Sequence, residues 1–414
     1  MDQASFFKSC CIFQSLSVAL VTGLGVLLAS CKANAGAKVT TQQVEGSVTA
    51  PGQGSVVVVP PPPPPPTSVG LQLASIASNF SVESELVPSW GSGKIAESGA
   101  PDEVGAFRFI CNAAHIAKVD PIVYPGQPGK GHLHQFFGNT ETDANSTYES
   151  LRKTGDSTCS GPLNRSAYWM PAMMNGRGQV VRPDYVQIYY KRLPISSPKC
   201  DPKKSATSPG ICVDLPRGLR FIFGYDMVSG KSPTGALTFG CASPNGAETK
   251  GPDLVSAAKG CAAGGKLEAR ITAPACWDGK NLDSPNHRDH VAYPSYGNWG
   301  YIKCPDTHPY VIPTFEMGAF YTVDADLNTS GNWDGTLNGW HLSSDDMPGM
   351  PMKPGSTFHT DWFGAWDDTV MQMWTDNCIN KLLTCSGGDL GNGKQLKGYS
   401  GFSWNASPRL VPVP

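Results

Sequence analysis

Short runs of β-branched and aromatic residues recur along the chain, and clusters of Gly, Pro, Asn and Asp separate them. Runs of this length between turn-forming residues predict strands. The clearest runs span residues 103–111, 185–193, 219–226 and 310–323. The best helical pattern spans residues 367–383, where Val370, Trp374 and Cys378 share one face. The pattern therefore predicts a mainly β protein with a few short helices.

The chain favours one large domain behind a separate N-terminal region. A globular composition continues from residue 70 to residue 414, and residues 194–265 resemble an insertion rich in Pro, Gly, Ser and Lys. The 46 glycines and 36 prolines of the chain favour loops over a helical bundle. We expect a loop-rich β-sandwich or jelly-roll-like domain, stapled by disulfides.

The first residues predict export. An apolar stretch at residues 12–30 follows Lys8, and the letters LLAS precede Cys31, as in a bacterial lipobox whose cysteine is lipidated. Cleavage after Ala35, behind the letters ANA, is the competing interpretation. We expect a signal peptide at residues 1–31 and a Pro-rich flexible linker at residues 32–69, in which the prolines of residues 60–66 form a stiff spacer. The protein would then be lipid-anchored in the bacterial envelope, on the outer membrane or cell surface, or secreted.

Cysteine content agrees with an oxidising compartment. Ten cysteines follow the predicted signal and lipidation site, and an even number is typical of a disulfide framework. Cys200 with Cys212, and Cys378 with Cys385, are plausible local pairs, whereas the other pairings stay open. Metal-thiolate sites are the weaker alternative, because the chain has no CxxC spacing.

The charge of the chain indicates no particular binding partner. The formal net charge is -2 and only 16% of the residues are charged, which argues against a nucleic-acid surface or a polybasic membrane patch. We therefore expect a monomer that contacts a membrane only through its lipid anchor.

Six of the candidate site residues fall into three tight pairs. They are His132 with His134, His287 with His290, and His359 with Asp361. Residues two apart in a strand share a face, and residues three apart share a face of a helical turn. Each pair can therefore present two ligands from one element, and together they predict a site for one divalent transition metal of unknown identity. No HExxH motif is present, so a helix-based metalloprotease is not supported.

Two other interpretations stay open. A histidine could act as general base, oriented by Asp289 or Asp361, or the histidines could only complete a hydrogen-bonded scaffold. Glycoside hydrolysis by two carboxyl groups is the other chemistry, because it needs an acid and a base or nucleophile a short distance apart. Its candidates are Asp278, Asp283, Asp289, Glu316, Asp345, Asp346 and Asp361.

Tryptophans in polar loops point to carbohydrate. An indole ring can stack on a sugar while its N–H bonds a hydroxyl, although packing beneath loops is the simpler role. The candidate stacking residues are Trp277, Trp299, Trp340, Trp362 and Trp366.

Five stretches together resemble the secreted family known as domain of unknown function 1996. They read VDPIVYPGQPGKGHLHQFFGN, AYWMPAM, ACWDGKNLDSPNHRDHVAYP, CPDTHPYVIP and FHTDWFGAW, and the resemblance covers residues 106–380. The family's histidines correspond here to His132, His134, His287, His290 and His359, followed by Asp361. One departure is the family's usual Asn-Gly-Trp after that Asp, where this chain has Phe363, Gly364, Ala365 and Trp366.

This resemblance implies an exported protein that occurs in fungi and bacteria and, in fungi, beside carbohydrate-binding or cell-wall modules. It assigns no reaction. We therefore expect a histidine-lined site that acts on or binds polysaccharide or cell-wall glycan, as a glycan-degrading hydrolase if it is an enzyme. The alternatives are a non-catalytic carbohydrate-binding lipoprotein and a structural domain.

Overall fold

The computed structural model describes residues 72–89, 104–159, 161–296, 301–347 and 349–414. Every described residue belongs to one unit of the chain, Pro64–Pro414. The predicted signal peptide, the lipidation site at Cys31 and the linker therefore lie outside the described residues. Among the helices of the described stretches, we find none with the length and apolar character needed to cross a membrane.

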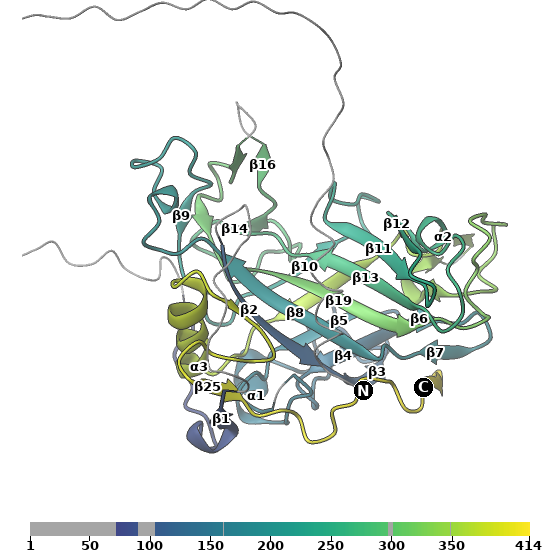
Figure 1. Ribbon diagram of the computed structural model, residues 1–414, viewed down its shortest axis with the longest axis horizontal. Helices are drawn as coiled ribbons and strands as arrows, with labels where there is room; N and C mark the ends of the chain where they lie inside the picture. The colour runs from purple at the N-terminus through teal and green to yellow at the C-terminus, as the bar shows by residue number, and fades with distance from the viewer. Residues whose placement is uncertain (1–71, 90–103, 160, 297–300, 348) are drawn as a thin grey trace, which may run out of the picture. The chain divides into compact units, whose positions relative to one another are not determined.

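A seven-stranded sheet forms the first layer (Figure 1). Its strands, in spatial order, are β12 (Glu248–Gly251), β11 (Leu237–Ala242), β13 (Lys266–Thr272), β19 (Thr314–Thr322), β8 (Tyr185–Arg192), β2 (Gly105–Cys111) and β24 (Thr384–Cys385). All neighbours are antiparallel except β2 and β24, which run parallel. The strands alternate buried and half-buried residues, as in Tyr185–Arg192, so one face of this sheet is buried and the other is partly open to solvent.

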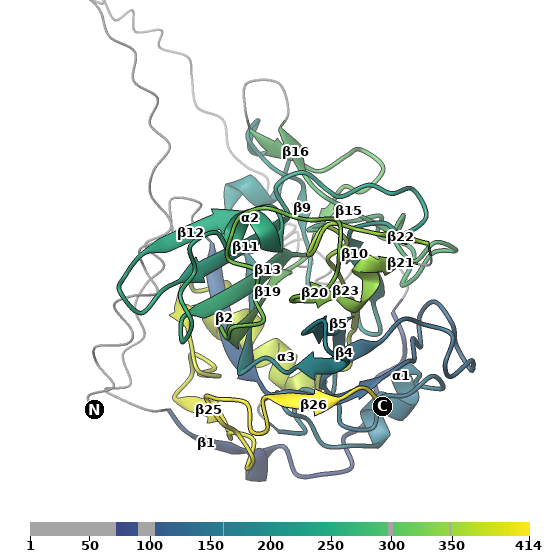
Figure 2. The ribbon, with the colours of Figure 1, turned by 90° about the vertical axis from the view of Figure 1, so that its right-hand side faces the viewer.

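A five-stranded antiparallel sheet forms the second layer (Figure 2). In spatial order it contains β10 (Arg220–Gly224), β23 (His359–Phe363), β5 (Ala167–Pro171), β4 (His134–Gly138) and β3 (Ala113–Ala117). Every residue of β23, β5 and β4 is buried, so both faces of this sheet are covered. The pairings of β10 with β23 and of β23 with β5 join segments more than a hundred residues apart in sequence.

Aromatic side chains hold the two sheets together. The ring of Phe315, on β19, lies 5.9 Å from Tyr168, 5.3 Å from Phe223 and 5.3 Å from Trp362, measured between ring centroids, and these partners belong to β5, β10 and β23. All four side chains are at most 1% exposed. The expected β-sandwich is therefore confirmed, with its main core between the two sheets.

Smaller elements complete the domain. Two further four-stranded sheets contain β15 (Val291–Ala292), β14 (Cys276–Trp277), β18 (Tyr310–Val311) and β9 (Ile211–Cys212), and β20 (His341–Leu342), β6 (Met173–Met174), β7 (Gln179–Val181) and β26 (Leu410–Pro412). Two-stranded pairs are β1 (Leu86–Pro88) with β25 (Lys394–Leu396), β16 (Ser295–Tyr296) with β17 (Ile302–Lys303), and β21 (Asp346–Met347) with β22 (Met350–Pro351). The α-helices are α1 (Tyr148–Lys153), α2 (Leu254–Ala257) and α3 (Asp368–Trp374).

The predicted elements are found with shorter bounds. The expected strand at residues 310–323 is split into β18 and β19 because Pro313 cannot donate to a ladder. The expected helix at residues 367–383 is α3, capped by the Asp367 side chain, followed by a π-helical turn, η7 (Thr375–Ile379).

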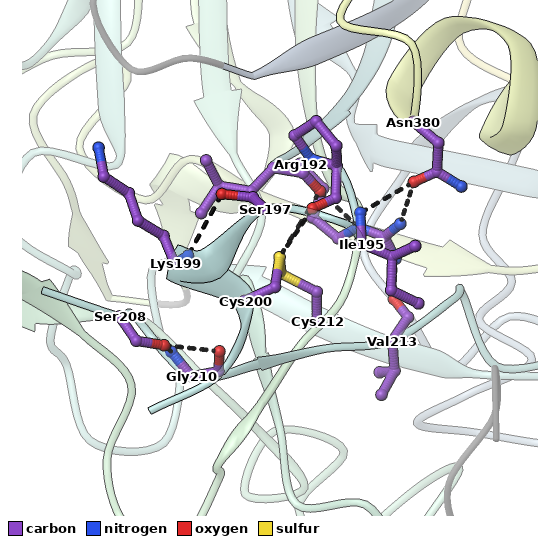
Figure 3. The surroundings of a disulfide bond; sticks show 12 residues. Arg192, Ile195, Ser197, Lys199, Cys200, Ser208, Gly210, Cys212, Val213 and Asn380 are labelled. Atoms are coloured by element: carbon purple, nitrogen blue, oxygen red, sulfur yellow. Dashed lines mark hydrogen bonds between the residues drawn. A yellow bond between two sulfur atoms is a disulfide. The ribbon is translucent and has the colours of Figure 1, made fainter. Parts of the chain in front are cut away.

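Residues 194–265, predicted as an insertion, contribute β10, β11 and β12 to the two main sheets. Its first part is held by the disulfide between Cys200 and Cys212, and Arg192 donates there to the carbonyl of Val213 and, over 3.0 Å, to Asn380 (Figure 3). The pairing of Cys200 with Cys212 and of Cys378 with Cys385 is confirmed. The other bridges join Cys111 to Cys159, Cys241 to Cys261, and Cys276 to Cys304.

Candidate functional site

The candidate site lies on the face of the five-stranded sheet that points away from the sandwich core. Directly opposed residues of antiparallel strands share a face, and so do residues two apart on one strand. The register places Ile222 opposite Asp361, and Asp361 opposite Trp169. Trp169 in turn opposes Phe136, two residues after His134. Four neighbouring strands, β10, β23, β5 and β4, therefore bring polar and aromatic side chains onto one face of the sheet. The ribbons of these strands are labelled in Figure 2.

Three histidines converge on this face. His134 begins β4, His359 begins β23, and His132 lies just before β4. One ring nitrogen from each of the three lies within 4.8 Å of the other two. The ring centroids of His132 and His134 are 4.1 Å apart, and those of His132 and His359 are 5.0 Å apart. This spacing fits three imidazole ligands around one small cation, because metal–nitrogen bonds are about 2.0–2.1 Å long.

Backbone carbonyls fix the rings of two of these histidines. Nδ1 of His134 lies 2.9 Å from the carbonyl oxygen of Val119, and Nδ1 of His359 lies 2.8 Å from that of Thr357. A carbonyl can only accept, so in both rings Nδ1 carries the proton and Nε2 keeps a free lone pair. Nε2 of His134 and Nε2 of His132 are buried and have no hydrogen-bond partner among the described residues. Metal-binding histidines use this arrangement, one nitrogen donating to a carbonyl and the other on the metal.

Burial keeps the three imidazoles neutral. It lowers the pKa of His134 and of His359 to about 3, with a neighbouring histidine lowering each further. Burial and the proximity of His134 hold the pKa of His132 well below its usual value. Neutral imidazole is the form that binds metals, so protons do not compete for this cluster near pH 7.

A pair of carboxyl groups adjoins the cluster. Oxygens of Asp120 and Asp361 lie within 4.8 Å of each other and of a ring nitrogen of His134. Asp120 is held in a turn, because its Oδ1 accepts the backbone N–H groups of Ile122 and Val123 over 2.9 and 2.8 Å. Oδ1 of Asp361 is buried without a partner among the described residues. The two oxygens extend the three-nitrogen cluster into a mixed imidazole and carboxyl site.

The carboxyl pair holds a proton. Burial raises the pKa of Asp361 well above its usual range, and the nearby Asp120 raises it further. Burial also raises the pKa of Asp120. Trp169 opposes both shifts as a nearby donor, although its Nε1 makes no hydrogen bond of good geometry. Two close carboxyl groups cannot both ionise cheaply, so Asp361 is the candidate proton donor of the site.

The loop between β14 and β15 borders this face. The backbone N–H of Ile222 donates to the carbonyl of His287 over 2.9 Å, and Ile222 opposes Asp361 in the sheet. Nδ1 of His287 lies 2.8 Å from Oδ1 of Asp283. The backbone φ of His287 is 58°, a positive value that is uncommon for a residue other than glycine. Arg288, next in the loop, donates to the carbonyl of Tyr225 over 3.0 Å, and its charge opposes the raised pKa of Asp361. The loop therefore adds a half-buried imidazole and a cation beside the carboxyl pair.

The structure brings four of the predicted site residues into the two clusters, and of the others His287 lies in the loop that borders this face. His132, His134, His359 and Asp361 belong to the two clusters, whereas His287 and His290 belong to neither. Both ring nitrogens of His290 are bonded, Nδ1 to Ser284 and Nε2 to the carbonyl of Arg220, so this histidine has no lone pair left for a metal.

The other predicted catalytic and stacking residues lie elsewhere. Asp289 is exposed, and its carbonyl accepts a bond from His308. Four predicted stacking residues are 0–3% exposed core side chains, which corrects that prediction: Trp277, Trp340, Trp362 and Trp366. Their indoles pack beneath the loops and sheets as core side chains and present no open face for stacking. Trp299 lies outside the described residues.

The pattern of paired histidines missed Asp120. Its sequence signal is an acid directly before Pro121, in a stretch whose backbone turns onto the Asp side chain. Such Asp-Pro steps mark many ordinary turns, so the signal was weak.

Comparison with known proteins identifies a family. The chain belongs to the family described as Domain of unknown function (DUF1996), whose model matches residues 120–366. The matched segment begins at Asp120 and includes all five residues of the two clusters. No curated protein and no solved structure gives a significant match.

Proposed function

We propose that this member of the family is an exported, metal-dependent hydrolase that acts on polysaccharide. The observation that carries the proposal is the convergence of three neutral imidazoles, two of them with a buried and unpartnered Nε2. In this proposal His132, His134 and His359 hold one divalent transition metal. Three imidazoles with room for a further ligand are typical of catalytic rather than structural sites.

The carboxyl pair supplies the proton chemistry. A bound metal would polarise an oxygen or lower the pKa of a water molecule. Asp361, kept protonated by burial, would donate its proton to the leaving oxygen, and the N–H groups on Asp120 would keep that second carboxyl in place. His287, oriented by Asp283, is placed to accept a proton at Nε2.

Export and the substrate class are supported by features outside the histidine cluster. Five disulfides are typical of an oxidising compartment and support export. The resemblance of the sequence to secreted proteins that occur beside cell-wall modules supports polysaccharide as substrate. The proposal also includes a divalent transition metal as the bound ion, the cell envelope as the location and a monomer as the oligomeric state.

A non-catalytic carbohydrate-binding protein is the second candidate. A polar groove beside Trp333, described below, favours it, because such a groove would bind glycan whether or not the histidine site performs a reaction. The structural-domain alternative is weakened by the convergence of three imidazoles, since a hydrogen-bonded scaffold does not require their ring nitrogens to lie within 4.8 Å of one another.

Metal analysis of the full chain, exported into an oxidising compartment and purified without chelators, tests the proposal. We expect about one metal per chain in the wild type and almost none in a His134→Ala and His359→Ala double variant. His308→Ala is the control, because both ring nitrogens of this half-buried histidine are bonded away from the site. A wild type that stays metal-free after incubation with zinc, copper, iron or manganese would overturn the metal site. Release of reducing ends from a glycan panel then separates an enzyme from a binder.

A further inference from the structure

A second candidate site is an open groove of about 500 Å³ outside the histidine cluster. One wall is the loop of residues 325–340, and the opposite wall is formed by Leu254, Val255 and Pro354. The volume falls in the range of small-ligand sites in proteins. The loop lining combines an indole with amide and hydroxyl side chains: Asn328, Ser330, Asn332, Trp333, Thr336 and Asn338.

The loop holds its half-buried tryptophan in place without a ligand. Nε1 of Trp333 donates to the carbonyl of Thr336 over 2.8 Å. The hydroxyl of Thr336 bonds Asp334 over 2.7 Å, and the amide of Asn328 bonds the carbonyl of Asn332 over 2.8 Å. Because the indole N–H is already bonded, the ring needs no polar partner and offers a fixed apolar plane. A rigid aromatic plane of this kind contacts a ligand at low cost in conformational entropy.

Two carboxylates, Asp326 and Asp334, are the charged groups of the lining, which therefore disfavours an anionic ligand. Asp334 accepts the backbone N–H and the hydroxyl of Thr336. Asp326 is paired with Arg177 over 2.8 Å and also accepts from Asn175. Trp340 forms a buried floor, with its Nε1 bonded to Asp324 outside the groove lining. The side-chain amide of the exposed Asn338 makes no hydrogen bond within the described part of the chain. Free amides beside a fixed indole suit a ligand with many hydroxyls and no net charge.

We propose that this groove binds a neutral stretch of polysaccharide, with a pyranose ring stacked on Trp333 and hydroxyls bonded by Asn332 and Asn338. The choice of polysaccharide rests on the proposed function, whereas the groove and its chemistry do not depend on a metal. The tryptophan that stacks on sugar is thus one that the described structure leaves accessible, and the buried Trp340 beneath it is support.

The groove and the histidine cluster are built on one segment. Pro354 lines the groove, and His359 follows five residues later on the same chain. Gly355 and Thr357 lie between these two residues in sequence, and their backbone N–H groups donate to the buried carboxylate of Asp345. On the other side, the hydroxyl of Ser343, three residues after Trp340, donates to the carbonyl of Leu133, which lies between His132 and His134. A chain bound in the groove is therefore held at a fixed position relative to the candidate metal ligands.

The test measures binding of the full-length protein to soluble glycans by calorimetry and affinity electrophoresis. The probes are mixed-linkage β-glucan, laminarin, xylan and glucomannan, with polygalacturonate as the acidic counterpart. We expect at least one neutral glycan to bind, Trp333→Ala to weaken it about tenfold, and Asn338→Ala to weaken it about threefold, all with unchanged metal content. Trp404→Ala is the matched control, because Trp404 is 56% exposed and packs on Phe402 and Tyr185 away from the groove.

Two outcomes would overturn the inference. One is a correctly folded wild type that binds none of the neutral glycans or binds polygalacturonate alone. The other is neutral-glycan binding that Trp333→Ala and Asn338→Ala leave unchanged. If the protein holds no metal but binds a neutral glycan, and the two variants lose that binding, the result would support the groove and reject the metal site. The two proposals can therefore fail separately.

Discussion

Three histidines of this protein are equally buried and differ in how their nitrogens are used. His134 is 1% exposed, His359 is 3% exposed and His290 is 0% exposed. His290 has a partner on each ring nitrogen, a hydroxyl on one side and a carbonyl on the other. His134 and His359 each bond a carbonyl through Nδ1, and both direct the remaining nitrogen into a shared cluster. Burial alone therefore does not mark a ligand, whereas the convergence of three imidazoles, each with a nitrogen free of a partner among the described residues, distinguishes the cluster from His290.

The difference carries an energetic cost. A buried polar atom without a partner costs about 1–3 kcal/mol, and the cluster has at least two such nitrogens. His290 avoids this cost because the loop between β14 and β15 wraps it with Ser284. A fold that satisfies one histidine and leaves its neighbours unsatisfied has kept those nitrogens available for a ligand.

Loss of one cluster histidine gives the largest expected effect. His359→Ala removes one nitrogen of three, and we expect zinc affinity to fall by more than about 100-fold, beyond the effect of losing an outer hydrogen-bond partner. His290→Ala should leave zinc affinity unchanged and lower the free energy of unfolding by about 2–4 kcal/mol, because it leaves a cavity and an unpaired carbonyl of Arg220. Competition with a chelating dye and urea unfolding measure the two quantities. Equal zinc affinities in both variants would contradict the contrast.

Acid should destabilise the metal-free protein through the cluster. The pKa of His134 is about 3 in the fold and 6.5 as the ordinary value, so between these pH values the unfolded chain binds a proton that the folded chain does not. Stability therefore falls as pH falls below 6.5, by about 1 kcal/mol per pH unit for this histidine. His134→Gln removes that proton, and we expect its stability to fall about 2 kcal/mol less than the wild type between pH 7 and pH 5.

Urea unfolding in the presence of a chelator, at several pH values, measures this difference. His308→Ala serves as the control, because both nitrogens of that histidine are bonded near the surface. Parallel curves for His134→Gln and the wild type would mean that the pKa of His134 is the same in the folded and the unfolded chain, which would contradict the lowered pKa.

The sequence carries the local half of this site. Spacing by two predicted that His132 and His134, and His359 and Asp361, share a face. The strand β23 contains both His359 and Asp361, whereas His132 lies just before β4 and still joins His134 in one cluster. Family resemblance and the mainly β class were likewise readable from the order of motifs and the strand-like runs. The long-range half was not readable, because β23 reaches β4 only through β5, and sequence spacing holds no information on that order.

Contacts between distant segments also decided which of the predicted site residues have a structural role. His290 looked equivalent to His134 in sequence, and only the carbonyl of Arg220, brought in by β10, shows that it is satisfied. Trp340 lies among Gly and Asn residues as an exposed stacking residue would, yet its indole is buried and bonded to Asp324. Composition around a residue predicts a loop, whereas the partners of its side chain depend on the whole fold.

A neutral carboxyl at Asp361 predicts a small effect on metal affinity. Burial and the nearby Asp120 raise the pKa of Asp361 well above its usual range and favour the neutral carboxyl, and Asp361→Asn keeps a neutral group of similar shape. We expect zinc affinity at pH 7 to change by less than about fivefold and hydrolysis of a bound glycan to be lost, since an amide cannot donate an acidic proton. A fall in zinc affinity as large as that of His359→Ala would instead make Asp361 a charged ligand of the metal.

The smallest expected effect comes from freeing one ring nitrogen of His290, which would then resemble His134 in having a buried nitrogen without a partner. Burial lowers the pKa of His290, so its ring is neutral, and Nε2 must carry the proton because it faces the carbonyl of Arg220. Ser284 therefore donates to Nδ1, and Ser284→Ala leaves that buried nitrogen without a partner. We expect the free energy of unfolding to fall by about 1–2 kcal/mol, with metal content and zinc affinity unchanged. A second zinc ion in this variant would show that one free nitrogen suffices, whereas its absence would show that binding needs the convergence of three.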